Sequence, residues 1–537
     1  MNFTKRFAYA VMALILLAAM AEAKPLNTIE AGPGIAVVET ESGTVQGYVH
    51  NGVYTYHGIP YAQAQRFAEP KPVAKWDGIR PALVWGDMAP QDTSRENDMF
   101  PSHWNWPYWE PHVLPMSEDC LNLNIWTNGI NDGKKRPVMV WFHGGGFVVG
   151  GAISDMAYDG ENLARTGDVV VVSVTHRLGV LGFLDLSAYG DEYKHSGNLG
   201  IVDLEASLKW IRDNIAQFGG DPNNVTIFGQ SGGGAKVLAL MATPSAKGLF
   251  HKGIVQSAAL IEANPVSNKV AELVMKNLGV STVEQLKQVP FDKLNAAGFK
   301  AMADAGQNMW RPMVDGDYIP EPPVADKFTS ISNDVPLMIG TALNEWVTLL
   351  DLPKMMTLQS DNKNNWTDEQ VKQKMKEKYG DKADAVAAAF KKAYPNKKPA
   401  DALFVENWLR QYMLQAMNTK ADQKGAPVYS YVFTWETPVM GGFAMSYHCS
   451  EIPFVFNNID IALTATGGSK DARKLAQRIS SAWVNFAKTG TPSAKGLPKW
   501  EAYTREGGAA MILDSRSSLV HNHDTELMKI LAPDYKW

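Results

Sequence analysis

Apolar runs, separated by stretches of helical periodicity, set the pattern of the first half of the chain. Runs as continuous as Val138–Phe142 and Val169–Val174 are typical of strands buried on both faces of a mostly parallel sheet. Residues 203–218 instead carry apolar side chains at helical spacing. This alternation predicts an α/β fold with helices on both sides of the sheet. The predicted strands span residues 36–40, 44–49, 121–126, 138–142, 169–174, 225–228 and 336–340.

The pattern changes between about residues 266 and 424, where lysine-rich amphipathic segments replace the strand-like runs. Asp368–Tyr379 is one predicted helix, with Thr367 as its N-cap and Gln370 as the capping partner three residues on. Neither a linker nor an internal repeat divides the chain. We therefore expect one large domain over residues 24–537, with helical insertions at roughly 266–424.

The N-terminal segment has the pattern of a signal peptide. Lys5 and Arg6 precede the apolar stretch Phe7–Met20, and Ala21-Glu22-Ala23 is a cleavage signal. We expect removal of residues 1–23 and export to a periplasm or to the medium. No later run is long enough to cross a bilayer, so no stable membrane insertion is expected after processing.

Charge and cysteine content narrow the possible partners and the source of stability. The formal net charge is −5 and is spread along the sequence, which argues against a nucleic-acid partner. Only two cysteines are present, Cys120 and Cys449, so the core rather than disulfides must hold the fold. The sequence leaves open whether these two pair, and it predicts no oligomeric state. Few cysteines and a short signal favour a bacterial source.

The most informative motif is Gly229-Gln230-Ser231-Gly232-Gly233, between the predicted strand 225–228 and a predicted helix at 235–241. A serine between glycines at a strand-to-helix junction is typical of a nucleophile elbow. Serine needs a histidine base, a carboxylate that holds the histidine, and backbone donors for the oxyanion. His143-Gly144-Gly145-Gly146 follows another buried strand, so its unshielded N–H groups, with that of Gly232, suit the oxyanion.

Chain position narrows the choice of base and acid, because this fold orders its triad Ser, acid, His. Among the histidines after Ser231, position favours His448, in a loop before Ile452-Pro453-Phe454. Glu345 follows the predicted strand 336–340 and is the candidate acid. Position alone leaves Asp315 and Asp351 as rivals for the acid. The other histidines are His251, His521 and His523, of which the last two form only a weak H-x-H metal signal that we discount.

Several segments together resemble the type-B carboxylesterase family, the esterase and cholinesterase branch of the α/β-hydrolases. The resemblance runs from about Glu39 to Trp500. It rests on Glu118-Asp119-Cys120-Leu121-Asn122-Leu123-Asn124, on Phe218-Gly219-Gly220-Asp221-Pro222 with the serine motif, and on Gly58-Ile59-Pro60-Tyr61-Ala62, Arg177-Leu178-Gly179 and Gly197-Asn198. It implies an α/β-hydrolase fold with a large, mostly parallel sheet and a helical subdomain beside the active-site mouth.

The resemblance also implies a role for each candidate residue. Glu345 follows the strand-ending Gly340 by five positions, as the family's acid does, and His448 precedes the family's Glu-Ile-Pro-Phe-Val-Phe stretch. The implied catalytic residues are Ser231, Glu345 and His448, and the implied oxyanion donors are Gly145, Gly146 and Gly232. The implied activity is serine carboxylic-ester hydrolysis of small to medium esters through an acyl-enzyme, with no cofactor and no metal.

Departures from the family pattern bear on specificity. The residue before the nucleophile is usually glutamate, and here it is Gln230; the neutral amide argues against a cationic substrate such as a choline ester. Gly232 stands where alanine is usual, and Cys120 lacks the upstream partner of cholinesterase-like members. The expected substrate is an uncharged, apolar or aromatic ester. Candidate pocket residues are Trp104, Trp106, Trp109, Met309, Trp310, Trp346 and Leu349.

Two alternative functions remain at this point. Some relatives that resemble cholinesterases have lost the nucleophile and act in adhesion, but this chain keeps the serine, histidine, glutamate and glycines. An amidase or a triglyceride lipase would use the same triad, because acyl transfer is common to all of them.

Overall fold

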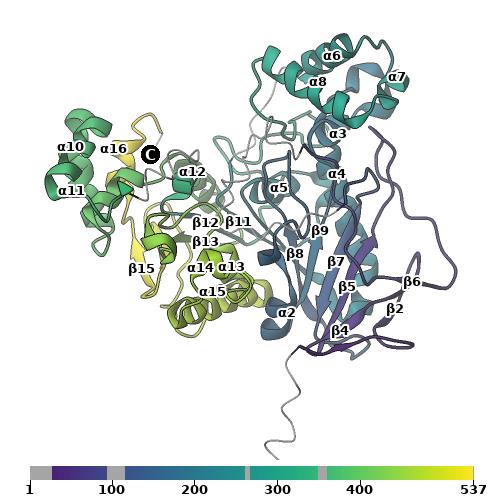
Figure 1. Ribbon diagram of the computed structural model, residues 1–537, viewed down its shortest axis with the longest axis horizontal. Coiled ribbons are helices and arrows are strands. Elements are labelled where there is room, and N and C mark those ends of the chain that lie inside the picture. The colour runs from purple at the N-terminus through teal and green to yellow at the C-terminus, as the bar shows by residue number, and fades with distance from the viewer. Residues whose placement is uncertain (1–26, 93–114, 260–266, 349–359, 536–537) are drawn as a thin grey trace, which may run out of the picture.

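The computed structural model describes residues 27–92, 115–259, 267–348 and 360–535, and its centre is a 12-stranded sheet (Figure 1). The strands from β9 to β14 in spatial order run parallel, and antiparallel strands flank them on both sides. In spatial order the strands are β1 (Ile29–Glu30), β4 (Tyr48–His50), β5 (Val53–Pro60), β7 (Asn122–Thr127), β9 (Val170–Val174), β8 (Arg136–Phe142), β10 (Gly220–Gln230), β11 (Lys252–Gln256), β12 (Leu337–Ala342), β13 (Val428–Phe433), β14 (Ala509–Leu513) and β15 (Ser518–His521).

The central strands are buried on both faces, as their apolar runs predict. Every residue of β8 and β9 is buried. Successive side chains point to opposite faces: Val138 and Val140 join one hydrophobic cluster, whereas Met139 and Trp141 join the other. The sheet thus separates two cores, which confirms the predicted α/β architecture.

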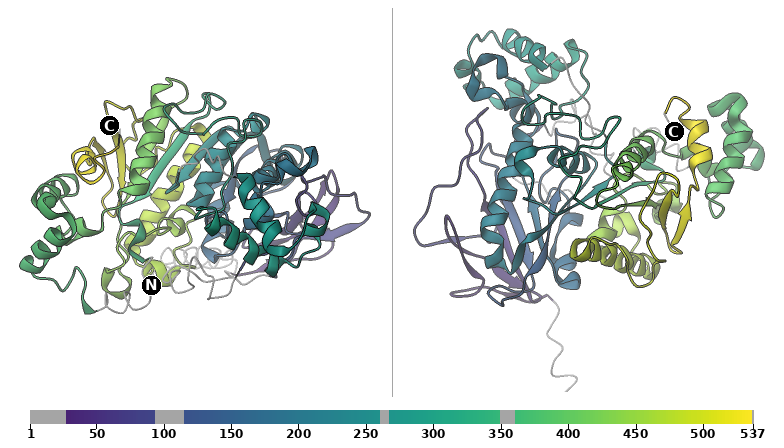
Figure 2. Two further views of the ribbon diagram at one scale, coloured as in Figure 1. Left: turned by 90° about the horizontal axis from the view of Figure 1, so that it is seen from above. Right: turned by 180° about the vertical axis from the view of Figure 1, so that it is seen from behind.

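Helices cover both faces of the sheet (Figure 2). On one face pack α4 (Leu199–Asn214), α5 (Gly232–Met241) and α12 (Trp408–Asp422). On the other face pack α2 (Glu161–Gly167), α13 (Ile452–Val455) and α15 (Lys470–Thr489). The shorter α3 (Gly179–Phe183) contacts α4, and α14 (Leu463–Thr466) precedes α15.

The lysine-rich region contains two helical groups with β12 between them in the chain. One group is α6 (Ser267–Leu278), α7 (Val283–Lys287) and α8 (Phe291–Asp304). The other is α10 (Asp368–Tyr379) and α11 (Ala383–Ala393), which pack with the C-terminal α16 (Thr525–Leu531). The groups lie at opposite sides of the molecule in Figures 1 and 2. The predicted helix Asp368–Tyr379 and its Thr367–Gln370 capping box are both present.

One predicted strand is in fact two. Residues 44–49 divide into β3 (Gly43–Gln46), which pairs with β2 (Val37–Thr40) and β6 (Ile79–Pro81) in a small sheet, and β4 of the large sheet. The chain changes sheets at Gly47, where a Cβ would lie 2.2 Å from the carbonyl oxygen of Thr55. Alternation of side chains does not encode such a transfer between sheets, so the sequence pattern missed it.

The structure also bears on the pairing of the cysteines, which the sequence left open, and on the membrane. Cys120 and Cys449 form no disulfide with each other. Over the described ranges, none of the helices combines the length and apolar character needed to cross a bilayer. The predicted signal peptide, residues 1–23, lies outside the described part of the chain.

Candidate active site

Ser231 occupies a sharp turn at the carboxyl end of β10, directly before α5. Its backbone angles are φ 57° and ψ −123°, which a residue with a side chain rarely adopts. The turn is held because the Ser231 N–H donates to the Gln256 carbonyl (2.8 Å) and the Ser231 carbonyl accepts from the Ala235 N–H (3.1 Å). A strained residue that its neighbours hold in place is a common feature of functional sites.

The glycine loop after β8 lies against this turn. A Cβ on Gly144 would be 3.5 Å from the Cβ of Ser231, and one on Gly232 would be 2.0 Å from the Gly146 carbonyl oxygen. The absence of side chains therefore lets the loop approach the serine closely. Among the described residues, the N–H groups of Gly145 and Gly146 donate no hydrogen bond to another protein atom, so they are available to a ligand.

His448 and Glu345 meet beside the same turn. The Nδ1 atom of His448 lies 2.5 Å from Oε2 of Glu345, and both side chains are buried. The backbone binds the pair as well, since the His448 N–H donates to the Glu345 carbonyl (2.5 Å) and the Ala342 N–H donates to Glu345 Oε1 (2.8 Å). The carboxylate thus fixes both the position and the tautomer of the imidazole.

Opposing effects act on the pKa of His448. Burial lowers it, but Cys449 and the Glu345 carboxylate raise it, and the net pKa lies well above its ordinary value. Burial, with a further contribution from Glu345, also raises the pKa of Glu406 and that of Glu451 to about 7. Several carboxyl groups are therefore buried around the imidazole, an environment typical of catalytic sites.

Gln230 connects the serine turn to the histidine. Its Nε2 lies 3.3 Å from each ring nitrogen of His448, and its Oε1 accepts a hydrogen bond from the Cys449 thiol (2.9 Å). Within the described structure no hydrogen bond joins Ser231 Oγ to His448. The imidazole nevertheless lies against the residue adjacent to Ser231, and hydrogen bonds between catalytic groups often tighten only when substrate binds.

The other candidates for base and acid lie elsewhere. His251 accepts from the Val225 N–H in the middle of β10 (3.1 Å), and His521 contacts Glu501 (3.0 Å). His523 contacts Tyr394 (3.2 Å). Asp315 accepts from the Ile319 N–H within a turn (2.9 Å). Asp351, the other alternative to Glu345 as the acid, lies outside the described residues.

The predicted pocket residues differ in their positions. The Trp346 ring stacks on the His448 imidazole, with centroids 4.5 Å apart. The sulfur of Met309 would be 3.5 Å from a Cβ on Gly146, so Met309 borders the glycine loop. Trp310 is buried against Gly298 of α8, which indicates a packing role. Trp104, Trp106, Trp109 and Leu349 lie outside the described residues.

Three contacts of the site were missed from the sequence: Gln230 with the imidazole, the Cys449 thiol with Gln230, and the stacking of Trp346. The position of each residue next to a predicted catalytic residue was the one available signal. Among the described residues, no three His, Cys, Asp or Glu side chains cluster in a way that could hold a metal ion.

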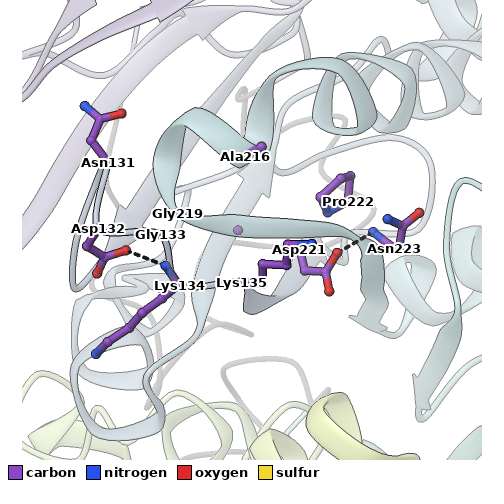
Figure 3. Close-up of a pocket in the computed structure, with 11 residues that line it drawn as sticks. Asn131, Asp132, Gly133, Lys134, Lys135, Ala216, Gly219, Asp221, Pro222 and Asn223 are labelled. Carbon is purple, nitrogen blue, oxygen red and sulfur yellow. Dashed lines mark hydrogen bonds between the residues drawn. The ribbon is translucent and has the colours of Figure 1, made fainter.

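A hollow of about 330 Å³ lies at the opposite, amino end of β8 and β10 (Figure 3). Asp132 and Asp221 form its acidic part, and each accepts a hydrogen bond from a nearby backbone N–H, of Lys134 (3.1 Å) and Asn223 (3.0 Å). None of the serine, histidine or glutamate candidates lines it.

A strained serine at a strand-to-helix turn, a neighbouring glycine loop and a histidine–glutamate pair at the carboxyl ends of a parallel sheet are the features of an α/β-hydrolase active site. Comparison with known proteins agrees with this class. The model of the carboxylesterase family matches residues 35–529. The chain belongs to this family and is a carboxylic ester hydrolase.

Individual relatives cover nearly the whole chain. Para-nitrobenzyl esterase of Bacillus subtilis is 34% identical over 93% of this chain and 98% of its own length. Phenmedipham hydrolase of Pseudarthrobacter oxydans is 30% identical, over 90% and 96%. Among solved structures, an esterase of Clostridium hathewayi, described as able to hydrolyse aliphatic aromatic polyesters, has a TM-score of 0.86 at 36% identity over 95% of this chain and all of its own.

Proposed function

We propose that the enzyme cleaves esters through an acyl-enzyme on Ser231, with His448 as general base and Glu345 as its partner. The observation that supports this most strongly is the contact between His448 Nδ1 and Glu345 Oε2 at 2.5 Å. This pair lies beside the turn that holds Ser231 at φ 57°. In this mechanism His448 removes the proton of Ser231 as the hydroxyl attacks the carbonyl carbon. Glu345 stabilises the imidazolium that forms.

The tetrahedral intermediate carries a negative oxygen next to the glycine loop. The N–H groups of Gly145, Gly146 and Gly232 would donate to it, because the first two have no hydrogen-bond acceptor among the described residues and Gly232 opens α5. His448 then protonates the leaving alcohol. Water, activated by the same imidazole, releases the acid and restores Ser231.

Substitution of the nucleophile tests the mechanism. Ser231→Ala is expected to abolish turnover of a para-nitrophenyl ester, a loss of about 10⁶-fold in kcat by analogy with other serine nucleophiles. Ser257→Ala is the matched control, because Ser257 also has a positive φ (50°) and also directly follows a strand of the sheet, here β11. It should keep its turnover. Turnover retained by Ser231→Ala would refute the mechanism.

We further propose uncharged esters with an apolar or aromatic group as substrates. Trp346 beside the imidazole and Met309 beside the glycine loop support this preference, as does the neutral Gln230. The preference can be measured with a choline ester and its uncharged 3,3-dimethylbutyl isostere. We expect kcat/KM to be equal or higher for the isostere, and a clear advantage of the choline ester would contradict the proposal.

Export is a separate proposal, which the charged start, apolar stretch and Ala-x-Ala site of residues 1–23 support. N-terminal sequencing of the enzyme recovered from its native source should begin near Lys24. A mature protein that starts at Met1 would contradict export by this route.

A further inference from the structure

A lysine is buried directly behind the glycine loop. Lys236 lies on α5, five residues after Ser231, and its side chain is 0% exposed. Its Nζ donates to the His143 carbonyl (2.8 Å) and lies 5.8 Å from the centroid of the Phe147 ring. Among the described residues it has no ion pair with a carboxylate. A buried amine without a counter-charge is costly, so an apolar residue here would ordinarily stabilise the fold more.

The cost is visible in the pKa values of this cluster. Burial lowers the pKa of Lys236 well below its usual range. Burial, followed by the neighbouring Lys236, also lowers the pKa of both His143 and His176, whose rings stack with centroids 5.0 Å apart. Lys236 thus favours neutral imidazoles beneath the loop.

The hydrogen bond from Lys236 is the first of two that hold successive carbonyls of the loop. Lys236 holds the carbonyl of His143, and the Nδ1–H of His143 donates to the carbonyl of Gly144 (2.8 Å). The carbonyl of Gly144 belongs to the same peptide unit as the N–H of Gly145. Because a trans peptide is planar, its carbonyl and N–H point in opposite directions. Fixing the Gly144 carbonyl therefore also fixes the direction of the Gly145 N–H.

We propose that Lys236 is a positioning residue that aligns the oxyanion donors, by anchoring the His143 carbonyl from beneath the loop. The inference rests on the proposed function, because it assigns a purpose to the loop only if an oxyanion forms at Ser231. It explains why a polar amine stands in the otherwise apolar stretch Ala235–Met241. Without the anchor, the loop would keep the bond from His143 to the Gly144 carbonyl but lose the side-chain donor to the His143 carbonyl.

Lys420 supplies a matched control elsewhere in the fold. It is also 0% exposed, and it also donates to backbone carbonyls, those of Ser332 (2.8 Å) and Asn333 (3.0 Å). Burial lowers the pKa of Lys420 to about 8. It lies on α12, and its hydrogen bonds go to the segment before β12 and not to the glycine loop. The two lysines share their burial and their type of hydrogen bond, and differ in what they hold.

The test replaces each lysine with methionine, which is unbranched, shorter by one heavy atom, and lacks the donor. We expect Lys236→Met to lower kcat by about 10- to 100-fold. This loss is at or below the loss of about 10²- to 10³-fold that is typical when an oxyanion donor is removed, because here the donor is displaced and not removed. KM should change by less than about threefold, because the donors act mainly in the transition state. Lys420→Met should keep kcat within about twofold, whatever it does to the melting temperature.

A second readout separates alignment of donors from general damage. A catalytic serine adds to the carbonyl of an aryl trifluoromethyl ketone and forms a stable tetrahedral adduct with an oxyanion. The matching methyl ketone binds in the same place but forms no such adduct. Lys236→Met should weaken inhibition by the trifluoromethyl ketone by about the factor lost in kcat, and leave inhibition by the methyl ketone nearly unchanged. Lys236→Gln, which keeps a shorter donor, should recover part of both losses, and it serves as the test variant if the methionine variant does not fold.

The outcomes distinguish this inference from the proposed function. If Ser231→Ala retains turnover, the mechanism itself fails. If Ser231→Ala is inactive but the folded Lys236 variants match Lys420→Met in kcat and in trifluoromethyl ketone inhibition, only the role of Lys236 is overturned.

Discussion

The two ends of β8 and β10 carry different chemistry on the same strands. At the amino end, the open hollow of Figure 3 is lined by acidic groups, of which Asp132 is exposed. A hydrogen bond from the basic side chain of Arg136 lowers the pKa of Asp132 to about 2. At the carboxyl end the carboxyl groups are buried, and burial raises the pKa of Glu451 to about 7. The amino end has a hollow with exposed acidic groups, and the carboxyl end has strain and desolvated polar groups.

This difference teaches that strain and buried polar groups, rather than the presence of a hollow, indicate the functional end of these strands. Ser231 has a positive φ, and His448 is buried against the Glu345 carboxylate. Strain and the burial of such groups cost stability, and strained residues cluster at functional sites. The hollow at the amino end has no histidine–glutamate pair among its lining residues, and its positive-φ residue Asn131 (φ 52°) is of a type that tolerates this conformation. Four tests can break or sharpen the comparison, and they follow from the largest expected effect to the smallest.

Removal of a carboxylate should give the largest difference between the two ends. Glu345→Gln is expected to lower kcat by about 10⁴-fold, because the carboxylate no longer selects the reactive tautomer of His448 and no longer stabilises its imidazolium form. Asp132→Asn removes a carboxylate from the amino end and should leave kcat within about twofold. Steady-state hydrolysis of a para-nitrophenyl ester measures both. Equal losses in the two variants would contradict the division between the ends.

Crowding of the glycine loop should give the next largest effect. In Gly232→Ala the new methyl group would lie 2.0 Å from the Gly146 carbonyl oxygen, so the loop must move away from Ser231. We expect kcat to fall by about 10²-fold, near the loss of one oxyanion donor, with KM changed little. Gly133→Ala, at the amino end, meets no neighbouring atom and is the control, though its φ of 71° will cost some stability. An unchanged kcat in a folded Gly232→Ala enzyme would argue against the assigned donors.

A charge placed beside the imidazole should change the pH dependence. In Gln230→Glu a carboxylate replaces an amide nitrogen that lies 3.3 Å from both ring nitrogens, which stabilises the imidazolium and raises the pKa of His448 further. The base must be neutral to act, so the acidic limb of the kcat/KM profile should move to higher pH. Rates on the alkaline plateau should change much less. A limb that stays in place, or moves to lower pH, would contradict the role of His448 as base.

The smallest effect is expected at the hollow itself. Lys134→Ala and Lys135→Ala change exposed side chains at the amino end, and kcat and KM should each stay within about twofold of the parent values. The melting temperature should hardly change. A loss of more than tenfold in kcat from either variant would show that the hollow participates in turnover, and the comparison would then need revision.

The sequence predicted most clearly those features that depend on local chemistry. The runs 138–142 and 169–174 formed buried strands because both faces of the sheet are covered, and Thr367 capped its helix with Gln370 as partner. The helix predicted at 235–241 begins earlier, at Gly232, since three glycines carry no apolar periodicity to mark its first turn.

Features that depend on distant segments were less accessible. The contact of Gln230 with His448 joins residues 218 positions apart, and periodicity carries no information about it. The burial of Lys236 was missed for a similar reason, although a lone lysine within the apolar stretch Ala235–Met241 was a signal. The sequence motifs identified the candidate catalytic residues, but only the tertiary packing determines which side chains surround them.

Covalent labelling tests the central claim most directly. The enzyme would be treated with a fluorophosphonate, which reacts with an activated serine, and the modified peptide identified by mass spectrometry. We predict one adduct, on Ser231, that is absent from Ser231→Ala and forms far more slowly in His448→Ala. An adduct on another serine, or equal labelling of the parent and Ser231→Ala enzymes, would contradict the account.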